Sequence, residues 1–142
     1  MTTHQLAEGY RKKCNDRLAA LEVLMARDAW SDVVRESQEV VELALKGVLR
    51  AIGVDPPKWH DVGDLLIEFE MQLPMLGGDR VRELAAASKS LRKEREFSFY
   101  GDVDFIPTDE YDREDAQSAF TQARQATEAL ETVLPPKPNI DR

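Results

Sequence analysis

The sequence predicts an all-α fold, an antiparallel bundle of about five helices, on three observations. Apolar residues recur every three or four positions along five segments, no convincing stretch alternates with period two, and glycine or proline ends most of these segments. The 142 residues, of which 42% are hydrophobic and 32% charged, suit one globular domain with its own core. We expect the bundle to span residues 1–134 and a frayed tail to follow at 135–142.

The first two helices are expected at about Thr3–Ala29 and Asp32–Ile52. Ser31 is the expected N-cap of the second helix, and Gly53 with the paired prolines after it ends that helix. The single cysteine, Cys14, falls on the apolar line of the first helix. That position favours a small core residue over a nucleophile.

Three further helices are expected in the rest of the chain. A short one begins at Trp59–Asp61, and Asp79 caps the next, which ends in the aromatic turn Phe99–Asp102. Asp112 caps the last helix, whose first turn is acidic. The acidic loop before Asp112 lacks the ordered spacing of a calcium loop, so we expect a solvated loop, no metal and no cofactor.

The fourth helix carries two arginines where apolar residues are expected. Its buried line, from Val81 to Leu91, continues onto Arg92 and Arg95. A guanidinium stays charged in proteins and is costly to bury unpaired, so these two should meet carboxylates, a partner subunit or an anionic ligand. Its planar fork suits phosphate oxygens. Glu36, at the edge of the apolar stripe of the second helix, is a candidate carboxylate partner.

Charge and composition restrict the classes of partner. The net charge of -8 and the pI near 4.8 disfavour an extended grip on a DNA duplex, although a local basic pocket remains compatible with them. One cysteine allows no intramolecular disulfide, which fits a reducing compartment. No run reaches the roughly 18 apolar residues of a membrane span, and the N-terminus lacks an apolar signal core. We therefore expect a cytoplasmic protein without membrane contact.

Three segments together resemble the HEPN family of small α-helical proteins. They are residues 35–49 with the following Gly53 and paired prolines, then His60–Leu66, and then Leu91–Asp102. The resemblance covers most of the chain and implies a helical bundle that usually forms dimers. It also implies a functional context, because many HEPN proteins are ribonucleases, often toxins, and many are encoded beside a minimal nucleotidyltransferase (MNT) that acts as antitoxin.

The nuclease motif of the HEPN family is an arginine followed, after four to six residues, by a histidine. Arg92 and Arg95 match the arginine, but Tyr100 occupies the histidine position after Arg95, and no histidine lies downstream. This departure argues against activity as a metal-independent endoribonuclease. The stretch Tyr100–Asp102 instead resembles a tyrosine-turn-aspartate pattern that ends this helix in some non-nuclease HEPN proteins.

These observations lead to three functional hypotheses. The first is a homodimeric binding or regulatory module of a HEPN–MNT toxin–antitoxin-like system, which contacts a nucleotide, RNA or nucleotidyltransferase partner through Arg92, Arg95, Tyr100, Asp102 and Glu36. One alternative is a ribonuclease toxin in which Arg95 stabilises the scissile phosphate and Tyr100 or His60 replaces the histidine. The other is a structural assembly protein whose arginines only lock a dimer.

Overall fold

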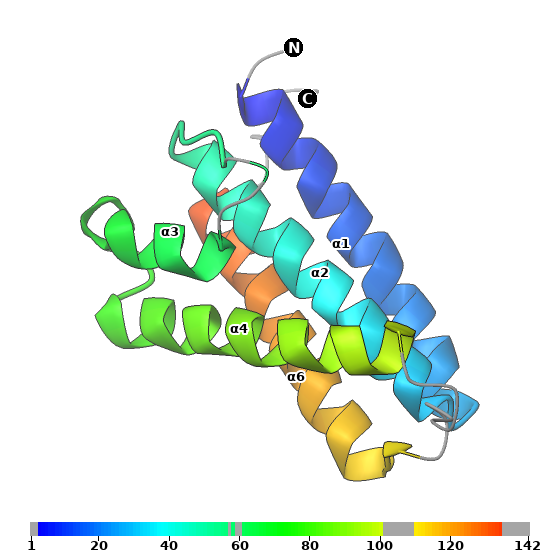
Figure 1. The fold of residues 1–142 in the computed structure, drawn as a ribbon. Coiled ribbons are helices and arrows are strands. Elements are labelled where there is room, and N and C mark those ends of the chain that lie inside the picture. Colours follow the sequence, from blue (N-terminus) through cyan, green and yellow to red (C-terminus); the bar gives the residue numbers. More distant parts are fainter. Residues whose placement is uncertain (1–2, 57, 59–60, 101–109, 135–142) are drawn as a thin grey trace, which may run out of the picture.

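The computed structural model describes residues 3–56, 58, 61–100 and 110–134, with side chains at these positions except 3, 4 and 92–100. The described residues contain helices and no β-strand, which confirms the all-α prediction (Figure 1). In chain order the elements are α1 (Thr3–Ala26), α2 (Trp30–Ala51), α3 (Val62–Glu68), the 3-10 turn η1 (Glu70–Gln72), α4 (Gly78–Tyr100) and α6 (Arg113–Val133).

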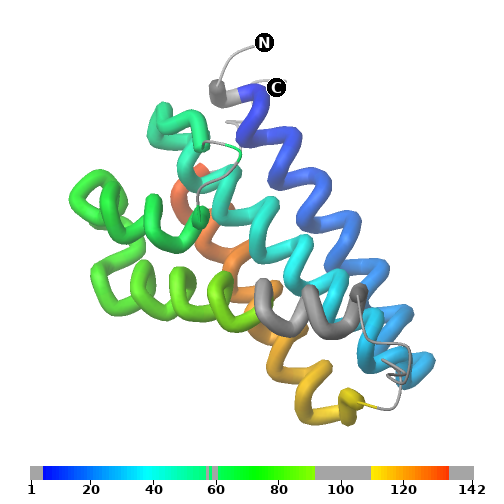
Figure 2. Tube along the Cα trace, in the orientation of Figure 1, coloured from blue at the N-terminus to red at the C-terminus, as the bar shows by residue number. Residues whose placement is uncertain are grey.

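Helix α2 is the centre of the bundle, with α1, α6, α4 and α3 packed around it (Figure 2). More than half of its circumference is covered, because apolar residues occupy several neighbouring helical positions rather than one narrow stripe. Burial of each large side chain contributes roughly 1.5–3 kcal/mol relative to leaving it exposed. The buried apolar residues of α2 include Val33, Val34, Val40, Val41, Ala44, Leu45, Val48 and Leu49.

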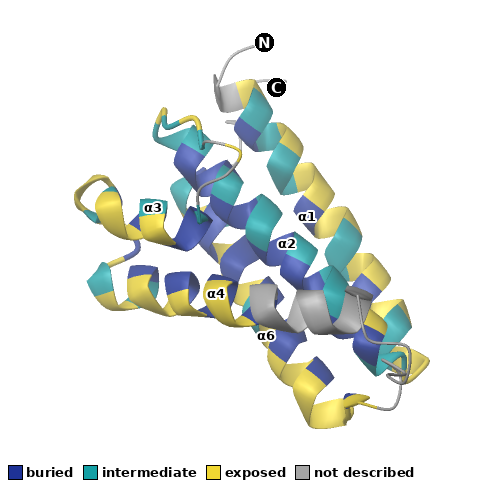
Figure 3. Cartoon of the chain, viewed as in Figure 1, coloured by how far each residue is buried: buried dark blue, intermediate teal, exposed yellow. Residues whose placement is uncertain are grey.

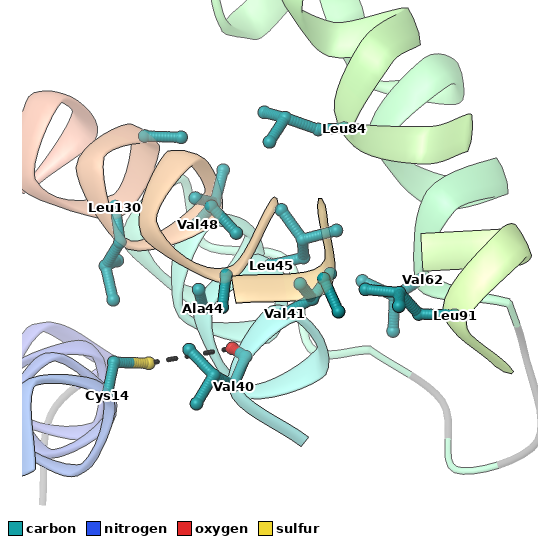
Figure 4. Packing of buried hydrophobic residues seen from close by; sticks show 14 of the residues in the cluster. Cys14, Val40, Val41, Ala44, Leu45, Val48, Val62, Leu84, Leu91 and Leu130 are labelled. Atoms are coloured by element: carbon teal, nitrogen blue, oxygen red, sulfur yellow. Dashed lines mark hydrogen bonds between the residues drawn. The ribbon is translucent and has the colours of Figure 1, made fainter. Parts of the chain in front are cut away.

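Helix α1 packs antiparallel on α2. Near the middle of α1 the thiol of Cys14 donates to the carbonyl oxygen of Val40 in α2, with 3.8 Å between sulfur and oxygen (Figure 4). Closer to the start of α1, Tyr10 lies against Gly47, which is later in α2. Cys14 has no exposed surface, as its place on the apolar line predicts.

Helix α6 runs in the same direction as α2. The guanidinium of Arg113 at the start of α6 lies 5.5 Å from the ring centroid of Trp30 at the start of α2. At the far end, Leu130 lies against Gly47. The chain returns to the starting end of α2 because α3 and α4 run across the bundle before α6 begins (Figure 1).

The apolar stripes predicted for α4 and α6 are buried as expected (Figure 3). On α4 they comprise Val81, Leu84, Ala85, Ser88 and Leu91, and on α6 Ala116, Ala119, Phe120, Ala123, Thr127 and Leu130, with Leu134 at the C-cap position. Consecutive helices are neighbours, as predicted, but the extensive packing of α2 on α6 joins helices that are distant in the sequence. Periodicity identifies the buried face of a helix and leaves open which helix covers it.

Two helix ends have the local structure that the sequence predicts. Gly53 has a φ of +83°, its N–H donates to the Arg50 carbonyl at 3.0 Å, and the N–H of Val54 donates to the Leu49 carbonyl at 2.9 Å. This is a Schellman motif, in which glycine takes the left-handed conformation at low cost. Asp61 caps α3 by accepting a hydrogen bond from the N–H of Gly63 at 2.8 Å.

Four predicted boundaries are wrong, and the first is the end of α1, which lies at Ala26 and not near Ala29. Helix α2 begins at Trp30 with Ala29 at the N-cap position, and Ser31 lies buried in the first turn without capping it. Helix α4 begins one residue before Asp79, which therefore lies in the first turn. The backbone of α4 also continues through Tyr100, where we expected a turn, because no glycine or proline interrupts it before Gly101.

Candidate functional site

A cavity of about 180 Å³ lies where α4, α6 and the start of α2 meet. Its walls combine apolar side chains with hydroxyl, amide and carboxylate groups, and polar groups of these kinds fix the orientation of ligands in pockets. The lining residues are Val34, Ser90, Leu91, Tyr111, Asp115, Ser118, Ala119 and Gln122.

The α6 wall of this cavity is fixed by a capping box. Asp112 Oδ1 accepts a hydrogen bond from the N–H of Asp115 at 2.9 Å, and Asp115 Oδ2 accepts one from the N–H of Asp112 at 3.0 Å. The backbone N–H of Asp115 is also the main reason that the pKa of Asp112 lies below its ordinary value. Tyr111, directly before the box, is buried at 8% exposure, so the start of α6 is anchored next to the cavity.

The α4 wall leads directly to the arginine-bearing part of that helix. Ser90 and Leu91 line the cavity, and the helical backbone continues through positions 92, 95 and 100. The side chains of Arg92, Arg95 and Tyr100 lie outside the described part of the structure, as does Asp102 as a whole. Their role in a binding site stays a prediction.

Glu36 lies on a different side of α2 from the cavity. Its Oε1 accepts a hydrogen bond from Arg17 Nη1 of α1 at 2.5 Å, and both residues line a groove between α1 and α2. Val34 faces the cavity instead, because two residues along a helix correspond to a rotation of about 200°. The described ion pair of Glu36 is thus with Arg17 of α1, whereas the sequence predicted a pair with the arginines of α4.

Gln38 is a buried polar residue that the sequence analysis did not single out. It has no exposed surface, and neither its amide nitrogen nor its amide oxygen has a hydrogen-bond partner among the described residues. It lies one turn along α2 from Val34, between apolar residues at positions 34, 41 and 45. The sequence does indicate this residue, because Gln38 occupies a position in the apolar line of α2 where an apolar side chain is expected.

Cys14 has the properties of a core residue. Burial is the main reason that its pKa rises to about 12, so its thiol stays protonated at neutral pH and is a poor nucleophile. Among the residues that the structure describes, no three histidine, cysteine, aspartate or glutamate side chains are grouped as metal ligands would be. His60 and most of the acidic loop before Asp112 lie outside those residues.

The fold and the cavity define a helical-bundle protein with a small polar cleft beside a basic helix segment. The model of the HEPN domain family matches residues 7–133, and the chain belongs to that family. Neither the curated proteins nor the solved structures gave a significant match. Over the described residues, none of the helices combines the length and the apolar character needed to cross a lipid bilayer.

Proposed function

We propose that this chain is a non-nucleolytic HEPN binding module that holds a nucleotide or an RNA through its phosphate at the arginine-bearing end of α4. The observation that carries the proposal is the cavity that ends at Ser90 and Leu91, directly before Arg92. A guanidinium is the side chain best suited to hold phosphate oxygens in a fixed geometry.

The lining of the cavity supports a division of roles between its polar groups and the arginines. The carboxylate of Asp115 would repel a phosphate placed inside the cavity, whereas Ser118 and Gln122 offer hydroxyl and amide groups. These groups suit the sugar or base of a ligand. The phosphate contacts then fall to Arg92 and Arg95, and the net charge of -8 limits binding to this local site.

The sequence of the motif favours binding over cleavage. The chain has two histidines, and both precede Arg92. Tyr100 is a poor substitute as a general base, because the pKa of an ordinary tyrosine is about 10. The functional context we propose is a HEPN–MNT toxin–antitoxin-like system, with a minimal nucleotidyltransferase as the protein partner, and copurification of the two coexpressed proteins would test that part.

The binding proposal is tested by fluorescence anisotropy with labelled ADP and with a 5′-phosphorylated RNA oligonucleotide. We expect Arg92→Ala and Arg95→Ala each to weaken binding at least about tenfold, since a hydrogen bond to a charged group contributes about 1.5–3 kcal/mol. Arg82→Ala is the matched control, because this α4 arginine is 59% exposed and its pairs with Glu70 and Asp79 lie at the surface. No binding by the unmodified chain, or an equal loss in the control, would contradict the proposal.

The same samples separate the two alternatives. We expect total RNA to remain intact after incubation with the purified protein. Cleavage that disappears in Arg95→Ala would support the ribonuclease toxin instead. Loss of a dimer in Arg92→Ala and Arg95→Ala, without ligand binding by any form, would support the assembly protein. Circular dichroism of each variant controls for loss of fold.

A further inference from the structure

The end of α3 and the turn that leads from it to α4 carry three exposed, large apolar side chains. Ile67 is 48% exposed, Met71 90% and Met75 49%. Among the described residues one further large apolar side chain is exposed, Val23 of α1. Single exposed apolar residues are normal on protein surfaces, whereas three within one short segment call for an explanation. We call Ile67, Met71 and Met75 the Ile-Met patch.

The backbone holds the Ile-Met patch at one end of the molecule. The coil of α3 continues into η1, where the N–H of Gln72 donates to the Phe69 carbonyl at 2.9 Å. Ile67 and Met71 are four residues apart along this coil, so they lie on the same side of it. Met75 belongs to the turn that follows η1 directly, and Figure 1 shows this turn at the same end of the molecule.

The core contacts of this segment come from its other side. Leu66 and Leu73 have no exposed surface, and Leu76 is 7% exposed. In Figure 3 buried and exposed surface both occur along α3, which fits a segment with a buried and an exposed side. A helical segment that is apolar on both sides is expected to be covered on both sides. Since the leucines already supply the core contacts, the Ile-Met patch is available for a contact outside the chain.

The surroundings of the Ile-Met patch are acidic. From Asp61 to Asp79 the chain has five carboxylate residues and neither lysine nor arginine. Arg82 and Lys89 of α4 pair with three of these carboxylates at the surface. Glu68 belongs to none of these pairs, is exposed, and is the last residue of α3, which has no basic residue in its last turn. A carboxylate adds to the negative potential at the C-terminal end of a helix, so a cation from outside would be stabilised here.

We propose that the Ile-Met patch binds a basic amphipathic segment of another protein, in which lysine or arginine side chains flank large apolar ones. The apolar side chains of that segment cover the patch, and its cations lie against Glu68. Methionine suits such a contact, because its flexible thioether side chain adapts to the shape of a partner. The carboxylates repel nucleic acids and anionic lipids, so the charge favours a basic protein segment over either of them. The inference does not depend on ligand binding at α4.

Methionine methyl signals in NMR spectra test the proposal at the patch itself. The probe is a synthetic peptide of about four helical turns, made of leucine and lysine with leucine at helical spacing, and its control has glutamate in place of every lysine. In protein labelled with ¹³C at the methionine methyl groups, we expect the lysine peptide to shift the signals of Met71 and Met75. The signal of Met25, which packs against the core, should stay unchanged. Three side chains make a small interface, so the complex should be weak, and titration of these shifts measures its dissociation constant.

Two variants separate the apolar contribution from the charged one. Met71→Gln should weaken binding of the lysine peptide at least about tenfold, because a large apolar side chain no longer becomes buried. Glu68→Lys should weaken it at least about threefold and reduce its dependence on salt, because a like charge then faces the cations.

The matched controls lie near the end of α1, across the molecule from the turn between α3 and α4 (Figure 1). Val23→Gln replaces an exposed apolar side chain, and Glu22→Lys changes the net charge as Glu68→Lys does. Each should change the affinity less than about twofold, and circular dichroism verifies the fold of every variant. Unchanged Met71 and Met75 signals with the lysine peptide, equal shifts with the glutamate peptide or with a 5′-phosphorylated RNA oligonucleotide, or an equal loss of affinity in the controls would each overturn the proposal.

Discussion

Replacing Gln38 by methionine should stabilise the fold. Burial of an amide without a hydrogen-bond partner costs about 1–3 kcal/mol in mutational data. Gln38 has no exposed surface, and within the described part of the chain neither polar atom of its amide has a partner. Methionine has a similar volume and flexibility, so the repacking cost should stay below about 1.5 kcal/mol. We therefore expect the free energy of unfolding to rise by about 1–2 kcal/mol, which corresponds to a Tm increase of roughly 3–8 °C for a chain of this size.

The assay is urea unfolding followed by circular dichroism, with thermal unfolding as a second measure. Gln125→Met is the matched control, because Gln125 is exposed on α6 and its replacement should change stability by less than about 0.5 kcal/mol. If Gln38→Met instead destabilises the protein by more than about 1 kcal/mol, the Gln38 amide has a partner in solution and the reasoning is refuted. If the variant is more stable and ligand binding is lost, Gln38 is a functional residue kept at a cost in stability.

Two further predictions concern the packing of α2 and the start of α6. Gly47→Val should destabilise the protein by more than about 2 kcal/mol in urea unfolding, since even a Cβ at this position would lie 3.0 Å from both terminal carbons of the fully buried Leu130. Gly9 is the comparison, because a Cβ there would lie in open space on α1. Gly9→Ala should therefore stabilise the protein by about 0.5–1 kcal/mol. Asp112→Ala should lower the Tm at neutral pH by removing the capping box. The pKa of Asp112 is lower in the folded protein than in the unfolded chain. The ionised carboxylate therefore stabilises the folded state at pH values above the unfolded pKa, and this stabilisation is lost as the pH falls through the folded pKa. The Tm difference between wild type and Asp112→Ala should therefore shrink in acid, and a difference that is constant or grows in acid would contradict this linkage.

Much of the fold could be predicted from local patterns. The N-cap at Asp112 and the glycine end at Gly53 depend on residues close in sequence, and both were recognised from residue type and spacing. The start of α2 was misplaced because Ser31 resembles an N-cap, while burial of Ser31 and Trp30 in the first turn depends on tertiary packing. The continuation of α4 to Tyr100 was missed because aromatic residues are compatible with either a helix or a turn.

The candidate site was less accessible to sequence reasoning. The pattern placed Arg92 and Arg95 on the buried register of α4, and that helix does continue through both positions. Glu36 was predicted as a partner of these arginines because it borders the apolar stripe of α2. That stripe is so broad that its two edges face different helices, and Glu36 lies at the edge that faces α1. Gln38 was overlooked because a single glutamine within an apolar line has no local motif, and its burial becomes visible only in the packed structure.

The shared direction of α2 and α6 has a consequence for synthesis of the protein. About sixty residues separate the end of α2 from the start of α6, so a nascent chain carries an uncovered apolar strip on α2 while that segment is translated. At 5–20 residues per second this lasts roughly 3 to 12 seconds. The domain can close only when its last helix leaves the ribosome, which makes the unfinished chain a natural client for chaperones that bind exposed apolar helices.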